Sequence, residues 1–453
     1  MFFKAITKFI NKNKLLFIVV PIILTSIYFC RWILVYKFEP KYWENLYYES
    51  QWNIPNSKRV IGDDGVYRYI GYRLVNGENP FNVDYWVPPF GKYLYGIGTK
   101  YLSNPLFISL LFYLFLVYVF IKLCKEILPK KLIPISLIIF LLNPFVVSEI
   151  KNTMLDLPLT LLLTSSLLFF IKYIKSEKNT NFYLSIILLG LAVGTKPPFF
   201  VAAYALSFGI FLLNKHQFKK ILLLPVLMLM GYVLAYFFPY FIHHPNPIPW
   251  IRLHQKVFEF QKNNIGSQNW FSVITYLLYG RFMGYWVGAK ALYPTDFNLV
   301  FTFGSISVFI IYIKKLFTHK TIDAFGIICL IGIIYILMLF LVDFWPRYLM
   351  PLIPIFSLAI SYLLSTKKYS YPIYLALFIS LCFSYKNTII SPPREEFEKE
   401  FSGFQLLDRR KEMYQLLNTE SKSFTSENNF ITGKLPRFNP IKENNQWRMS
   451  IVQ

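Results

Sequence analysis

Two adjacent aspartates, Asp63 and Asp64, follow the first apolar segment of the chain, within residues 62–69 (GDDGVYRY). Neighbouring carboxylates repel one another and lose solvation near a bilayer, which favours a raised pKa for one of them and suits a general base. A carboxylate pair can also hold a divalent cation through its oxygens. Because Asp and Gly also favour turns and helix N-caps, a solvated turn is an equally good interpretation of the pair taken alone.

One more carboxylate and three basic residues stand next to apolar segments. Asp156 begins such a segment, where ionisable residues are costly and commonly functional, although a helix N-cap would also explain it. Arg347 and Lys196 could bind phosphate oxygens or could be interfacial residues that reach toward water. Lys92 follows a double proline and has the same two interpretations, and Tyr67 is a further candidate contact for substrate.

The elements that must position these residues are membrane-spanning helices. Of the 453 residues, 55% are hydrophobic and 16% are charged, and the apolar residues form long blocks. Blocks of about 20 apolar residues are long enough to cross a bilayer as helices, so we predict an all-α transmembrane bundle of about eleven spans. Their approximate limits are 15–36, 104–124, 132–149, 154–174, 182–195, 198–214, 220–241, 297–314, 324–342, 348–366 and 371–390.

Lysine clusters indicate how the bundle is oriented. The net charge is +23, and with this count every basic cluster in a short loop falls on the side of the N-terminal lysines. Positive charge in short loops marks the cytoplasmic side. We therefore expect a multi-pass protein of the cell membrane with a cytoplasmic N-terminus. Because topology explains the positive charge, we expect no nucleic-acid partner.

The opposite, extracytoplasmic side carries the long connections. Residues 37–103 and 242–296 form two long loops within a transmembrane domain of residues 1–390, and residues 391–453 form a small polar tail. Large loops gathered on one face commonly carry function. The active site and the tail are therefore predicted to be extracytoplasmic, with short helices lying at the membrane surface.

Four segments in order resemble motifs of the GT-C superfamily of membrane glycosyltransferases. The closest resemblance is to glycosyltransferase family 39, the protein O-mannosyltransferases and the aminoarabinose transferases that act on lipid A. The segments are Asp63-Asp64 followed by residues 88–92 (PPFGK), residues 152–160 (NTMLDLPLT), residues 190–198 (GLAVGTKPP) and residues 346–351 (PRYLMP). The resemblance covers about residues 1–390. In many relatives the pair is Asp-Glu, and His or Lys often stands where this chain has Val87.

The resemblance implies a glycosyltransferase that moves a hexose or pentose from a polyprenyl-phosphate donor to an acceptor hydroxyl, with inversion. It makes Asp63 the general base, with Asp64 orienting the acceptor or a metal and Asp156 nearby. Arg347, Lys196, Lys92 and Tyr67 are then the candidate contacts of the lipid phosphate and substrate. Its partners are the donor, membrane lipids and a protein, lipid or glycan acceptor. No cofactor is certain, and a divalent metal would be held by Asp63 and Asp64.

Two other functions remain open as alternatives. A transporter or flippase of lipid-linked sugars would share the many spans and the basic residues. Transporters usually place charged sites near the bilayer midplane, often with inverted repeats, whereas here the polar residues gather at one face and no repeat is visible. The second alternative is an O-antigen ligase or polymerase that uses a diphosphate-linked oligosaccharide. That class lacks an early Asp-Asp pair followed by Pro-Pro-x-Gly-Lys.

Overall fold

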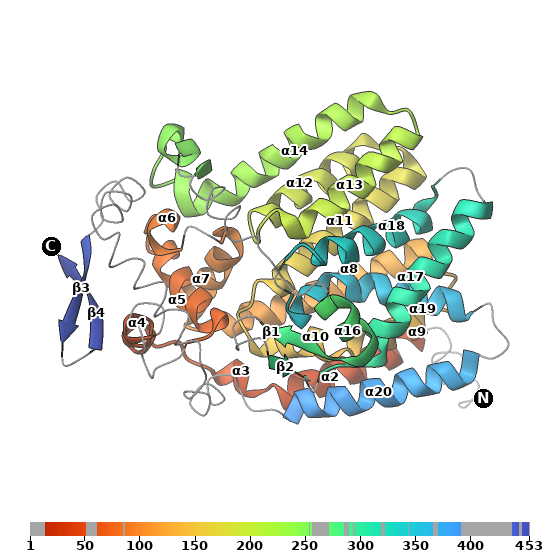
Figure 1. Cartoon of the computed structure of the whole chain (residues 1–453), viewed down its shortest axis with the longest axis horizontal. Helices are drawn as coiled ribbons and strands as arrows, with labels where there is room; N and C mark the ends of the chain where they lie inside the picture. Colours follow the sequence, from red (N-terminus) through yellow and green to blue (C-terminus); the bar gives the residue numbers. More distant parts are fainter. Residues whose placement is uncertain are drawn as a thin grey trace, which may run out of the picture.

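The computed structural model of the chain is a bundle of α-helices, many of them with roughly parallel axes (Figure 1). It describes residues 14–50, 61–84, 87–252, 254–255, 271–284, 290–292, 294, 296–318, 322–342, 344–365, 370–390, 437–443 and 446–452. Apolar segments form helices because a helix satisfies its backbone hydrogen bonds internally, as the hydrocarbon core of a membrane requires. The predicted all-α fold class is confirmed.

Among the described residues, five helices are long and apolar enough to cross a membrane. They are α8 (Pro105–Ile127), α11 (Asp156–Ser176), α14 (Phe218–Tyr236) continued by η2 (Phe237–Phe241), α17 (Leu299–Thr318), and η4 (Pro346–Leu352) continued by α19 (Ile353–Leu364). A pair bent by 56° passes the same test together, and consists of α9 (Ile133–Leu141) with α10 (Pro144–Ser148) and η1 (Glu149–Lys151).

The remaining long apolar helices are α2 (Lys14–Phe29), α12 (Asn179–Val193), α13 (Phe199–Asn214), α18 (Ala324–Leu339) and α20 (Ser370–Ile390). Each predicted span therefore contains a helix or a bent pair of helices. Several of these helices are shorter than the test requires, so the count of eleven spans stays a prediction.

The first long loop is mostly helical. It contains α4 (Pro40–Glu49), α5 (Asp63–Val75), α6 (Pro80–Val83) and α7 (Phe90–Leu102), and α3 (Trp32–Val35) leads into it. These helices gather at one end of the bundle (Figure 1). Phe38, Trp43, Ile61 and Tyr69 belong to a separate small apolar core beneath α5. The surface helices predicted for this loop are therefore present, and they carry a core of their own.

Short strands add to the helices, which the sequence did not predict. Strand β1 (Phe282–Gly284) pairs antiparallel with β2 (Lys290–Leu292) after the short helix α16 (Phe271–Tyr279), so Met283 lies opposite Ala291. Strand β3 (Arg437–Glu443) pairs antiparallel with β4 (Gln446–Val452) within the predicted polar tail. Residues 391–436 of that tail lie outside the described residues. Both hairpins lie in segments that were predicted only as loop or tail.

Asn-Pro pairs start three of these helices. The side-chain oxygens of Asn79, Asn104 and Asn143 accept hydrogen bonds from backbone amides at the starts of α6, α8 and α10. In each case proline follows at the first helical position. A backbone N–H at that position would have no partner within the helix, so the proline, which lacks the N–H, costs no hydrogen bond. The asparagine cap and the following proline therefore fix where these helices begin.

Glycines allow two pairs of helices to cross at close range. Gly71 on α5 faces Gly96 on α7, and Gly190 on α12 faces Gly231 on α14; a Cβ at any of them would overlap backbone of the opposite helix. Small residues permit such crossings in membrane proteins, where close van der Waals packing replaces the hydrophobic effect. The α5–α7 crossing matters most for function because α5 begins with Asp63.

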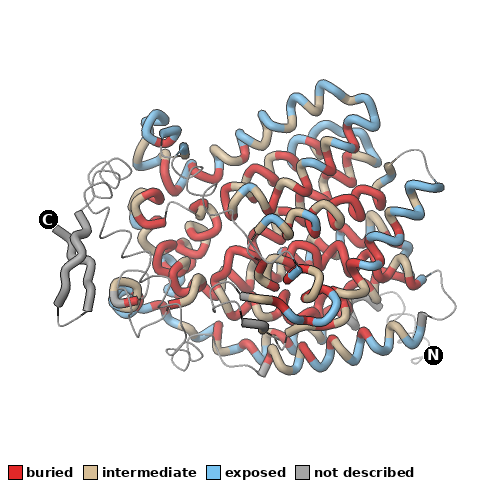
Figure 2. Tube along the Cα trace, viewed as in Figure 1, coloured by how far each residue is buried: buried red, intermediate tan, exposed pale blue. Residues whose placement is uncertain are grey.

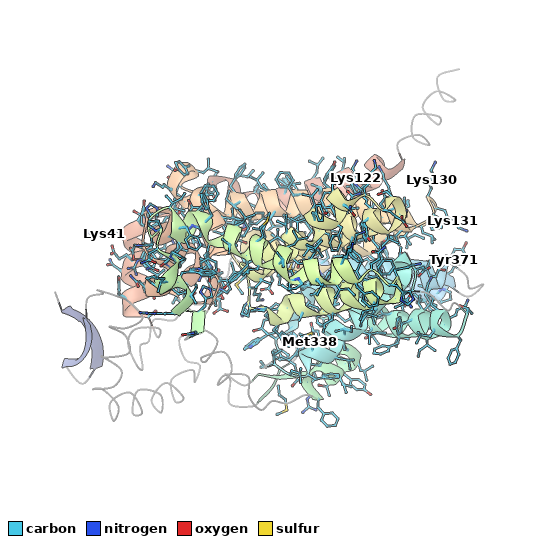
Figure 3. The ribbon with its side chains drawn as sticks, turned by 90° about the horizontal axis from the view of Figure 1, so that it is seen from above. Lys41, Lys122, Lys130, Lys131, Met338 and Tyr371 are labelled. Atoms are coloured by element: carbon cyan, nitrogen blue, oxygen red, sulfur yellow. The ribbon has the colours of Figure 1, made fainter. Side chains whose placement is uncertain are left out.

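The two ends of the bundle differ, and its flank is apolar. Lys122, Lys130 and Lys131 lie at one end and Lys41 at the other (Figure 3). Helix α14 exposes much of its outer surface (Figure 2), including the side chains of Leu222 and Val226. An exposed apolar helix flank is what hydrocarbon chains contact in a bilayer. The structure is therefore that of an integral membrane protein.

Candidate active site

Four chain segments bring the predicted charged residues together. Asp63 and Asp156 are the first residues of α5 and α11, Lys196 lies between α12 and α13, and Arg347 lies in η4. The first turn of a helix carries unpaired amides and a partial positive charge, which stabilise a carboxylate there. Both aspartates therefore lie next to the unpaired amides of a helix start.

Arg347 joins the two aspartates. Its Nη2 donates a hydrogen bond to Asp63 Oδ2 at 2.6 Å, and its Nε lies 4.0 Å from Asp156 Oδ2. Among the described residues, the hydrogen-bond contact of Nη1 is with the sulfur of Met154, at 4.0 Å. A thioether is a weak acceptor, so this part of the guanidinium is available to a stronger one.

Lys196 completes the charged group from its other side. Its Nζ donates to Asp156 Oδ1, and the ammonium lies over the rings of Phe200 and Tyr348, 4.4 and 4.6 Å from their centroids. Side-chain exposure is 9% for Lys196 and 2% for Asp156, against 29% for Asp63 and 23% for Arg347. The Asp63 end is therefore the accessible end of the group.

Asp64 does not share the environment of its neighbour. Its side chain is buried and its Oδ2 lies 3.7 Å from Nη2 of Arg68, one helical turn along α5. The two carboxylates thus contact different arginines, which offsets the mutual repulsion expected from the sequence. Within the described ranges, no group of three His, Cys, Asp or Glu side chains could hold a metal ion. A divalent cation held by Asp63 and Asp64 stays a prediction.

Tyr67 lies one turn after Asp63 on the same helix. Burial raises the pKa of its hydroxyl well above the ordinary value, and the negative charge of Asp63 adds to that shift. A tyrosine with a raised pKa stays protonated at neutral pH and keeps its hydrogen-bond donor. The role of Tyr67 as a substrate contact stays a prediction.

Lys92 lies in a different environment from Arg347 and Lys196. It is fully buried, and its Nζ donates to Asp84 Oδ2 at 2.8 Å and to the carbonyl oxygens of Val87 at 2.6 Å and Asp84 at 3.3 Å. Burial raises the pKa of Asp84, and the Lys92 ammonium opposes that shift. All three donors of the ammonium are used inside the protein. The geometry thus supports a role in holding the loop before the double proline, and phosphate binding by Lys92 stays a prediction.

The motif segments pack directly on one another. The amide of Phe90 donates to the carbonyl of Gly194 at 2.9 Å, and a Cβ at Gly91 would collide with Leu155 and Thr195. The hydroxyl of Tyr95 donates to the carbonyl of Met154 at 2.7 Å. The Pro-Pro-Phe-Gly-Lys segment therefore positions the loops that carry Asp156 and Lys196.

Several residues of the site were not among those predicted from the sequence. Arg68 and Asp84 are the buried partners of Asp64 and Lys92, and Tyr348 contacts Lys196 and lies beside Arg347. The spacing of Asp64 and Arg68, four residues apart at the start of a helix, is a signal that could have predicted their pairing. The pairing of Asp84 with Lys92 spans a loop and a helix start, so no periodicity could reveal it.

Residues 87–243 match the family of dolichyl-phosphate-mannose-protein mannosyltransferases. The matched segment contains Asp156 and Lys196, whereas Asp63 and Arg347 lie outside it. The ion pair of Arg347 with Asp156 therefore connects the matched segment with the rest of the chain. No curated protein sequence gives a significant match.

Solved structures share the fold. The crystal structure of ArnT from Cupriavidus metallidurans bound to undecaprenyl phosphate matches with a TM-score of 0.51 and 15% identity, over 77% of this chain and 62% of that one. The apo oligosaccharyltransferase of Archaeoglobus fulgidus matches with a TM-score of 0.52 and 14% identity, over 86% of this chain and 60% of that one. The chain thus spans less than two thirds of their length. The family match and these structures together confirm the predicted resemblance to GT-C membrane glycosyltransferases of the family 39 type.

Proposed function

We propose that this chain, a membrane protein with the fold of GT-C glycosyltransferases, transfers one sugar from a polyprenyl-phosphate donor to an acceptor hydroxyl on the extracytoplasmic face. The contact of Arg347 with Asp63 is the observation that carries the proposal. It places a carboxylate able to accept a proton next to a guanidinium able to bind a phosphate. Transfer from a phosphate donor needs both groups within the length of one sugar.

Asp63 is the proposed general base. Its side chain is partly exposed, and an adjacent guanidinium favours the ionised carboxylate that a base requires. The acceptor hydroxyl gives its proton to Asp63 while its oxygen attacks the anomeric carbon of the donor. The bond from that carbon to the phosphate oxygen breaks, and the polyprenyl phosphate leaves with the electron pair. A single displacement of this kind inverts the anomeric configuration.

Arg347 and Lys196 are the proposed contacts of the departing phosphate. Arg347 offers a planar group of donors, one of which already donates to Asp63. Lys196 adds a second positive charge on the other side of Asp156. Cations placed where negative charge develops lower the barrier to the step that creates it. Asp156 then serves to hold both cations in place.

The donor class is supported by the comparisons. The matched family is named for dolichyl-phosphate mannose, and the ArnT structure holds undecaprenyl phosphate. Both are phosphates of long isoprenoid lipids, which suits a site at the end of an apolar bundle. We therefore place a polyprenyl phosphate in the leaving group and leave the sugar open between a hexose and a pentose.

Transfer from radiolabelled polyprenyl-phosphate sugars in proteoliposomes tests the proposal, with a membrane and cell-wall extract supplying acceptors. Wild type is expected to label an acceptor, and folded Asp63→Asn is expected to lose at least about 10²-fold in rate because a general base contributes that much or more. Glu126→Gln is the matched control, since it removes a carboxylate from an exposed ion pair with Lys175. Equal transfer by wild type and Asp63→Asn would remove Asp63 as the base.

The product of the same assay tests the stereochemistry and the main alternative. A retained anomeric configuration would contradict the single displacement. The bent pair α9–α10 is the feature that most favours a flippase, because transporters use broken helices. Label that crosses the bilayer without joining an acceptor would support the flippase and overturn the proposed transfer.

A further inference from the structure

The second aspartate of the pair forms a buried ion pair that the proposed chemistry does not use. Side-chain exposure is 1% for Arg68 and 4% for Asp64, and Nη2 lies 3.7 Å from Oδ2. A buried ion pair often adds little net stability, because desolvation of both charges opposes their attraction. The pair is therefore better explained by the geometry that it imposes on α5 than by the stability that it adds.

Two aromatic residues, one before α4 and one within it, hold the guanidinium of Arg68. Its guanidinium carbon lies 4.6 Å from the ring centroid of Trp43 and 5.1 Å from that of Tyr36. Its Nη1 donates to the Tyr36 hydroxyl at 2.8 Å, and Trp43 Nε1 donates to the same hydroxyl at 3.1 Å. A guanidinium held by two rings and a hydrogen bond is a rigid partner for Asp64.

The backbone of Asp64 is fixed from the opposite side. Its carbonyl accepts a hydrogen bond from the hydroxyl of Thr153 at 2.6 Å, and Thr153 is fully buried. Thr153 lies three residues before Asp156, in the loop that leads into α11. Asp64 thus links α4 on one side with the Asp156 loop on the other, and Asp63 is the residue next to it.

We propose that Asp64 and Arg68 are positioning residues that fix the first turn of α5, so that Asp63 meets Arg347 in the reactive geometry. The inference rests on the proposed function for its kinetic consequence. Asp64 does not touch the substrate, because its side chain is enclosed; it acts through the orientation of Asp63. In this proposal Asp64 orients Asp63, whereas the resemblance implies that it orients the acceptor or a metal.

Kinetics of four variants in proteoliposomes test the inference, with rates expressed per folded molecule. Asp64→Asn and Arg68→Lys are each expected to lower kcat by about 10²-fold, the usual cost of misplacing a reacting group by about 1 Å. Asp64→Glu is expected to retain most of the activity, because its carboxylate still reaches Arg68. Arg73→Lys is the matched control, since Arg73 lies in the last turn of α5, away from Asp63, and pairs with Glu78 in the following loop.

The pattern across these variants separates positioning from chemistry. A positioning role leaves the donor KM and the pH profile as in wild type, because Asp63, Arg347 and Lys196 are unchanged. A changed pH profile or acceptor KM in Asp64→Asn, with normal kinetics in Arg68→Lys, would instead make Asp64 a catalytic residue. Normal kcat in both folded variants would overturn the positioning role.

Hydrogen exchange gives a second measurement that does not depend on transfer. Amides in the first turn of α5 are expected to exchange faster in Asp64→Asn and Arg68→Lys than in wild type or Arg73→Lys, because local opening becomes easier. Unchanged exchange would overturn the inference even if the variants were inactive. Failure of wild type to transfer any sugar would count against the proposed function alone, and the exchange result would still decide the positioning role.

Discussion

Alternating charges run through the site, from Lys196 through Asp156 and Arg347 to Asp63. Each charge lies next to one of opposite sign, which makes the burial of the inner pair tolerable. The outer pair is more exposed than the inner pair, so substrate reaches Asp63 and Arg347 first. In the proposed reaction Asp63 is the base, Arg347 and Lys196 contact the departing phosphate, and Asp156 holds these two cations in place.

Lys196→Met is expected to destabilise the protein by about 3 kcal/mol, because it leaves the Asp156 carboxylate buried without its closest cation. The loss lies at the low end of the usual range because Arg347 Nε remains 4.0 Å from the other oxygen. Thermal unfolding in detergent measures it. The double variant Lys196→Met/Asp156→Asn is expected to recover stability but not transfer. Unfolding of the single variant at the wild-type temperature would mean that the pair contributes nothing.

Helix α5 carries Asp63 at its first residue, and its place is set by the crossing with α7. Because Gly71 and Gly96 lack side chains, the two backbones approach closely. The carbonyl of Gly71 lies where a Cβ on Gly96 would be. Helix α7 in turn docks on the Gly194 carbonyl through Phe90. The position of the proposed base therefore depends on a chain of backbone contacts between short helices.

Gly96→Ala is expected to displace α5 or to cost more than about 1–3 kcal/mol, because the added methyl group overlaps the Gly71 carbonyl and a backbone cannot move aside as a side chain does. Gly209→Ala in α13 is the control: nothing lies within 4 Å of its Cβ position, and alanine favours helices. Thermal unfolding and transfer rates of both variants check this prediction. Equal behaviour of the two would show that the crossing is not tight.

The whole molecule has a basic end and an end that carries the site. Lys122, Lys130 and Lys131 mark the first, and the surface helices α4 to α7 gather at the other (Figures 1 and 3). Basic residues stay on the cytoplasmic side during insertion because moving them across the membrane is unfavourable. The prediction that the site is extracytoplasmic rests on this charge distribution.

Cysteine labelling in intact cells tests that orientation. Lys41→Cys is expected to react with a membrane-impermeant maleimide added outside, and Lys131→Cys is expected to react after the membrane is opened. Both substitutions are made in a Cys382→Ser background, because Cys382 is the exposed one of the four cysteines. Labelling of Lys131→Cys alone from outside would reverse the predicted topology and place the site in the cytoplasm.

The sequence by itself determined the fold class and the family resemblance. Long apolar blocks force helices because hydrocarbon cannot satisfy backbone groups, and this constraint is local enough to read from composition. It also identified Asp156, Lys196 and Arg347 as candidates, since each is an ionisable residue at the edge of an apolar block, and Asp63 as one of two adjacent carboxylates. These predictions needed no knowledge of which segments meet.

Only the tertiary structure decided which of these charges pair. Asp63 and Asp64 are adjacent in the chain, yet successive helical residues point in different directions, so one contacts Arg347 and the other Arg68. Lys92 stands in a motif beside a predicted phosphate site, yet a loop folds back and encloses it with Asp84. Pairing between residues far apart in sequence depends on how helices cross, and a single sequence contains no periodic signal for that.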